Sequence, residues 1–180
     1  MSHGYDPRPP AADGPVLALL ARAMELVNRL LLVPCMLALI AASGILTYSV
    51  LVRYFYKVPT DWQDEASVFM LVGATFLSGA YVQSVRGHIG IEALAGLLPA
   101  AVNRFRLILV DAASSAFCLF FAWKCWAMLH EAWTEGQTSS SSWGPPLWIP
   151  YSMMAAGMSL LALQLLLHLA ARLAARREIQ

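Results

Sequence analysis

The chain has 180 residues, of which 59% are hydrophobic and only 13% are charged, and its formal net charge at pH 7 is +1. Soluble globular proteins carry roughly 45–50% apolar and about 25% charged residues, so this composition argues against a soluble fold. It also excludes a disordered chain and a disulfide-stapled secreted domain. A nucleic-acid-binding protein would normally carry a basic excess, which is absent here. The remaining class is an integral membrane protein.

Four long apolar runs predict four transmembrane helices and therefore an all-α fold. The predicted spans cover residues 30–52, 66–85, 107–129 and 149–171. The first and last have 23 residues each, roughly 34 Å at about 1.5 Å per residue, enough to cross a hydrocarbon core of about 30 Å. Asp111 and Lys124 interrupt the third run, but both lie near its ends, where a long side chain can reach toward the headgroups.

The segments between the spans contain signals for helix starts and for membrane interfaces. Thr60 and Gln63 have the spacing of a capping box at the start of the second helix. Acidic residues in its first turn are favoured by the helix dipole. The Gly-, Ser- and Pro-rich stretch 136–146 predicts a loop, and Trp148 and Tyr151 beside it predict an aromatic anchor at the membrane interface.

Two further segments are predicted to be amphipathic. Residues 87–106 mix apolar and charged side chains and are too short to span, so we expect a helix on the membrane surface, with a plain connecting loop as the alternative. Residues 15–29 are a second candidate. The predicted organisation is an N-terminal segment 1–29, a membrane domain 30–171 and a basic tail 172–180.

The distribution of basic residues predicts the orientation. With four crossings, both termini and the 86–106 linker share one side, which holds nine Lys and Arg residues, whereas the other side holds Arg53, Lys57 and Lys124. Short loops rich in Lys and Arg stay in the cytoplasm, so both termini are predicted to be cytoplasmic.

The sequence contains no recognisable catalytic motif, neither a nucleophile elbow nor a phosphate loop nor HExxH, and we expect no enzyme activity. Among the histidines within reach of the spans, only His88 and His168 could meet to hold a haem between helices; a hydrogen-bonding interfacial histidine is the more ordinary interpretation. Asp111 is an intramembrane charge, which is often functional, but no other span offers a charge at mid-depth. We therefore expect Asp111 to be structural, paired with an Arg near the cytoplasmic side.

Several segments together resemble the small membrane subunit of tripartite ATP-independent periplasmic (TRAP) transporters, the DctQ-like family. The first is Arg53-Tyr54-Phe55 followed by Trp62-Gln63-Asp64-Glu65, similar to the family's R…W-x-E-E with Asp64 in place of Glu. The second is Gly79-Ala80 with Arg86-Gly87-His88-Ile89-Gly90-Ile91-Glu92, similar to G-A…H-I-x-I/V-D/E. The third is Gly136-Gln137-Thr138 with Pro146-Leu147-Trp148-Ile149-Pro150-Tyr151. The Pro-Ile-Gly that often follows is reduced here to Gly157.

The resemblance implies a scaffold subunit in the bacterial inner membrane. Its partners would be a large multi-span subunit, which carries the substrate and sodium sites, and a periplasmic substrate-binding protein. The complex would import an organic acid such as a dicarboxylate, and this chain would bind no cofactor itself. The alternative is a membrane anchor for a haem or quinone redox enzyme.

The resemblance also assigns structural or partner-contact roles to individual residues. Trp62 would anchor the second helix at the outer interface, where Glu65 would pair with a base, Arg53 being the nearest. Arg86 and His88 would fix the turn into the surface segment.

Overall fold

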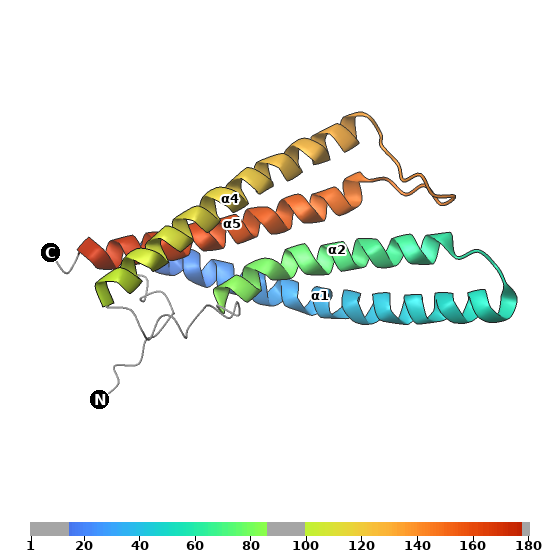
Figure 1. Cartoon of the computed structure of the whole chain (residues 1–180), viewed down its shortest axis with the longest axis horizontal. Helices are drawn as coiled ribbons and strands as arrows, with labels where there is room; N and C mark the ends of the chain where they lie inside the picture. Colours follow the sequence, from blue (N-terminus) through green and yellow to red (C-terminus); the bar gives the residue numbers. More distant parts are fainter. Residues whose placement is uncertain (1–14, 86–99, 178–180) are drawn as a thin grey trace.

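The computed structural model describes residues 15–85 and 100–177, which form four helices (Figure 1). These are α1 (Pro15–Tyr56), α2 (Asp61–Ser84), α4 (Ala100–Thr134) and α5 (Trp148–Arg177). Each contains a stretch long and apolar enough to cross a membrane, and the described ranges contain no strand beyond one isolated bridge. The predicted all-α membrane fold is therefore confirmed.

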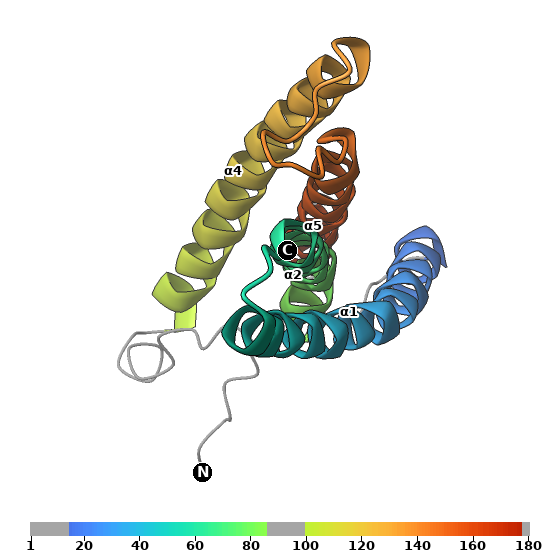
Figure 2. The same ribbon diagram turned by 90° about the vertical axis from the view of Figure 1, so that its right-hand side faces the viewer.

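The four helices form an open row instead of a square bundle. α4 packs on α5, α5 on α2, and α2 on α1, while α1 and α5 touch only slightly (Figure 2). α2 and α4, which follow each other along the chain, are thus separated by α5. The turn between α1 and α2 and the loop between α4 and α5 lie at the same end of the helix axes (Figure 1). We call this the turn end, and the opposite end the open end.

Small side chains form the contacts between the helices. Cys118, Ala122 and Cys125 of α4 face Ala155 and Ala162 of α5, with larger apolar groups filling the gaps around them. Small residues let helix backbones approach closely in lipid, where dispersion contacts and hydrogen bonds replace the hydrophobic effect between helices. All three cysteines are buried and form no disulfide, in keeping with this packing role.

Where α2 and α5 cross, their backbones come so close that one of them must have a glycine at the contact. A Cβ atom at Gly157 would overlap the backbone carbonyl of Phe76. Gly73 lies against the flexible side chain of Met153, whose sulfur would be 2.6 Å from an added Cβ. Gly157 therefore sets how tightly the two helices cross, because a backbone carbonyl cannot rotate away as a methionine side chain can.

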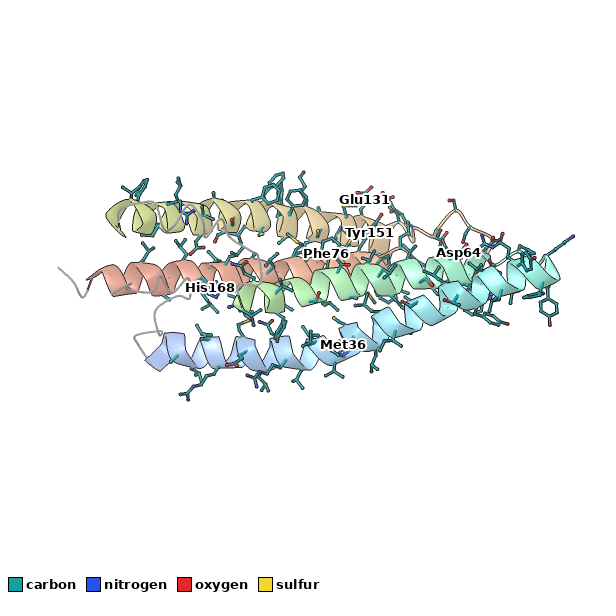
Figure 3. All side chains as sticks on the ribbon, turned by 60° about the horizontal axis from the view of Figure 1, so that its bottom comes forward. Met36, Asp64, Phe76, Glu131, Tyr151 and His168 are labelled. Carbon is teal, nitrogen blue, oxygen red and sulfur yellow. The ribbon has the colours of Figure 1, made fainter. Side chains whose placement is uncertain are left out.

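α1 is much longer than its predicted span. The predicted amphipathic segment 15–29 is not a separate surface helix but the continuous beginning of α1. Pro34 lies inside the helix, and α1 bends near Met36 (Figure 3). Proline removes a backbone hydrogen bond and clashes with the preceding turn, which accounts for a bend at this place.

The other predicted spans lie within or overlap the observed helices. Residues 100–106, the last part of the predicted surface segment, form the first turns of α4. The remainder of that segment, residues 87–99, and the Arg86–His88 turn lie outside the described residues.

Candidate functional site

Polar contacts at the turn end connect α1, α2 and the α4–α5 loop. Arg53, in the last turn of α1, places Nη2 2.7 Å from Asp64 Oδ2 and 2.8 Å from Thr60 Oγ1. Its Nη2 also lies 3.1 Å from Ser49 Oγ, one turn earlier on α1. We call Ser49, Arg53, Thr60 and Asp64 the arginine cluster.

The arginine cluster combines two buried hydroxyl groups with a half-exposed ion pair. Ser49 and Thr60 are buried, whereas the side chains of Arg53 and Asp64 keep 54% and 48% of their exposure. An ion pair this exposed contributes little by itself in water. Its larger role is to satisfy the two buried hydroxyl groups, because a buried polar atom without a partner is costly.

Two of the predicted contacts at this site are wrong. Thr60 does occupy the N-cap position of α2, but its side chain makes no capping hydrogen bond. Its Oγ1 accepts hydrogen bonds from Arg53 instead. The predicted Arg53–Glu65 pair is replaced by Arg53–Asp64, since one helical residue turns the side chain by about 100° and only Asp64 faces α1.

Glu65 binds the α4–α5 loop. Its carboxylate accepts hydrogen bonds from the hydroxyl groups of Ser139 and Ser141, the second at 2.5 Å. Asp61, one turn earlier, accepts a third from Ser142 at 2.9 Å. The three serines lie more than seventy positions along the chain from the carboxylates that they bind. Acidic residues near the N-terminus of α2 therefore hold the distant loop in place.

The loop also closes on itself. At the end of α4, Gly136 has a positive φ of 61°, and the Gln137 N–H donates to the Ala132 carbonyl at 3.0 Å, a Schellman-type ending. Further along, the Leu147 N–H donates to the Gln137 carbonyl at 3.0 Å. These backbone bonds order the loop between α4 and α5, which presents its serines toward α2.

Aromatic side chains surround the turn end. Trp62 is half exposed at the start of α2, and Trp148 makes an edge contact with Trp133, their ring centroids 5.2 Å apart. Tyr151 lies one turn further along α5 and is partly buried. Tryptophan and tyrosine favour the membrane–water interface, so this level of the helices fits one membrane surface.

A second polar group lies between α1 and α5 toward the open end. Buried Asn28 donates to Gln164 Oε1 at 3.4 Å, and Gln164 Nε2 lies 3.0 Å from His168 Nε2. This nitrogen of His168, the residue predicted as one haem candidate, is thus engaged by a neighbouring amide. The other candidate, His88, lies outside the described residues. Asp111 is 2% exposed, within the face of α4 that packs on α5.

Several members of this site were not predicted from the sequence, among them Ser49, Asp64, Ser139 and Ser141. Ser49 had a detectable signal, since it precedes Arg53 by four residues and shares its helix face. The serines had none, because four of them follow one another in 139–142 and their pattern does not show which face α2. Among the described residues, no group of three metal-ligating side chains occurs.

Four helices long and apolar enough to cross a membrane, joined at one end by polar contacts, define a small multi-span membrane protein. The chain matches the family described as tripartite ATP-independent periplasmic transporters, DctQ component, over residues 42–175. This match covers well over half of the chain, which therefore belongs to the DctQ family. No curated protein matches the chain.

Proposed function

We propose that this protein is the scaffold subunit of a TRAP transporter in the bacterial inner membrane, with both termini in the cytoplasm. It supports a large multi-span subunit that carries the substrate and sodium sites. A periplasmic protein captures the substrate, an organic acid such as a dicarboxylate, and delivers it. The family match over residues 42–175 carries this proposal, since that family is a transporter component and not an enzyme.

The arrangement of the helices supports a role in packing. An open row leaves the outward sides of α1 and α4 covered by no described helix, and both expose many large apolar side chains. Nine basic residues on the side of the termini against three on the other support the cytoplasmic assignment. The turn end, with its ordered acidic and serine-rich surface, then faces the periplasm, where the binding protein docks.

Affinity purification of the full chain, tagged at its C-terminus, from native membranes in mild detergent tests the proposal. We expect a much larger multi-span protein in stoichiometric amount, identified by mass spectrometry. A coloured preparation with absorbance near the Soret band and a soluble redox subunit would instead support the redox-anchor alternative. Recovery of the chain alone would contradict both.

A further inference from the structure

The outward side of α4 carries a charged residue within its membrane-crossing part. On α4, the buried residues recur at alternating intervals of four and three, giving a seam against α5. The seam consists of Asp111, Ser115, Cys118, Ala122 and Cys125. At about 100° per residue, Phe120 and Lys124 lie on the opposite side of the helix, and both are exposed. Phe117 and Trp123 lie beside them and are also exposed.

Lys124 is deep relative to the polar end of the helix. It lies seven residues, about 10 Å along the axis, before Glu131, which is on the outward side of α4 (Figure 3). Its ammonium group is 4.7 Å from the centroid of the Trp123 ring and 5.9 Å from that of Phe120, four residues further from the turn end. Side chains on a helix lean toward its N-terminus, so Lys124 leans away from the nearer membrane surface.

No carboxylate among the described residues forms an ion pair with Lys124. The two aromatic rings offset part of the cost of a charge at this depth, but a cation–π contact is weaker than a charge-assisted hydrogen bond. Charged side chains within transmembrane helices normally face a protein interior and pair with one another. Lys124 instead faces away from α5, the helix on which α4 packs, and from the other helices that the structure describes.

The outward side of α1 differs in this respect. There, Arg29 is paired with Glu25 at 2.6 Å on the same helix, and Arg53, which lies on the side of α1 that faces α2, is paired with Asp64. The exposed side chains between these pairs, such as Leu37 and Tyr48, are apolar or aromatic and suit lipid. The outward side of α4 thus carries a charge that no described carboxylate neutralises, whereas the charge on the outward side of α1 is paired. This difference favours α4 as the helix that binds a protein.

We propose that the outward side of α4, defined by Phe117, Phe120, Trp123 and Lys124, docks against a membrane-embedded helix of the large subunit, and that Lys124 binds an acidic side chain of that helix. This rests on the proposed function. A lipid phosphate is disfavoured as the counter-ion because it lies at the headgroup level, toward which Lys124 does not lean.

The test uses the tagged full chain in native membranes. Lys124→Met removes the charge without shortening the side chain much, and we expect recovery of the large subunit to fall at least tenfold. Lys124→Arg keeps the charge and should retain most of the recovery. Lys57→Met, which neutralises the exposed lysine in the α1–α2 turn, is the matched control and should retain it fully. The level of each variant in the membrane is measured alongside.

A photo-crosslinking amino acid in place of Phe117 gives a second readout that does not depend on complex stability. We expect an adduct with the large subunit. No adduct from Phe117, an adduct with a second copy of this chain, or full recovery with Lys124→Met would overturn the inference. If those results come with normal recovery by the wild-type chain, the scaffold function stands and only the docking face is wrong. If the wild-type chain recovers no large subunit, the function itself fails.

Discussion

α5 and α1 are both long apolar helices, yet they are stabilised by different surroundings. α5 lies between α4 and α2, and 39% of its most apolar stretch is buried, compared with 11% for α1. α5 therefore depends on close contact with two neighbouring helices. α1 packs along one neighbour only, α2, and depends on lipid over most of the rest of its surface. Apolar composition alone does not distinguish these two situations, because lipid tails and a protein interior are similarly apolar.

The sharpest test of this difference is a glycine-to-alanine series. Gly157→Ala on α5 should cost about 3 kcal/mol of stability, because the added methyl group overlaps a backbone carbonyl of α2. Gly73→Ala should cost less, since Met153 can rotate away. Gly44→Ala on α1, with no atom within 4 Å of the added group, should be neutral or slightly stabilising. Thermal unfolding in detergent measures all three, and equal effects at Gly157 and Gly44 would remove the distinction.

The second-largest effect is expected from breaking the hydrogen bonds between α2 and the loop that precedes α5. Glu65→Ala removes the acceptor of two serine hydroxyl groups and should weaken loop closure by about 2 kcal/mol. Limited proteolysis of the 139–143 stretch should then accelerate, by roughly thirtyfold if cleavage follows local opening. Asp61→Ala, which loses one exposed contact, is the control. Unchanged cleavage in the Glu65 variant would mean that the backbone bonds alone hold the loop.

The link between α2 and α1 should be weaker. Asp64→Ala should cost about 1 kcal/mol, because the ion pair with Arg53 is half exposed. Exchanging the charges, with Arg53→Asp and Asp64→Arg in one chain, should restore part of the loss. The same exchange between Arg53 and Glu65 should restore nothing, because Glu65 faces the loop. Thermal unfolding of the single and double variants decides which carboxylate is the partner.

The smallest effect is expected where α1 and α5 meet directly. Asn28→Leu should change stability by only about 0.6 kcal/mol, the usual size of a hydrogen bond between helices in a membrane. The bond to Gln164 is long at 3.4 Å, and Asn28 Oδ1 has no partner among the described residues. A loss several times larger, again by thermal unfolding, would show that the open end of α1 is held as firmly as α5.

The sequence predicted the membrane helices well because apolar runs of 20 residues or more, three of them uncharged and the third interrupted only by Asp111 and Lys124, rarely form anything but a transmembrane helix. It did not predict that α1 would continue back to Pro15, since the charges at Arg22, Glu25 and Arg29 suggested a separate surface segment. A helix can leave the membrane without ending, so charge marks the edge of the membrane and not the edge of the helix.

The candidate site was predicted only in part. Its location followed from Arg53 and the acidic residues that open α2, and the structure pairs Arg53 with one of these, Asp64. The choice of Asp64 over Glu65 did not follow, because adjacent helical residues point in directions that only the packing of α1 and α5 on α2 distinguishes. The sequence did not predict the order of the helices in the row either. Small residues mark faces where helices pack closely, but they occur in all four helices and so do not show which helix packs on which.

The position of α5 in the row has a consequence for biosynthesis. α1 and α2 are adjacent in sequence and in space, so they can pair as soon as both have entered the bilayer. α4 then enters without its neighbour, because the described contacts join it to α5 and scarcely to any earlier helix. Only when Trp148–Arg177 has been synthesised and inserted between α2 and α4 do the two halves become one protein. A ribosome that stalls before this last helix therefore leaves α4 in the membrane without the helix on which it packs.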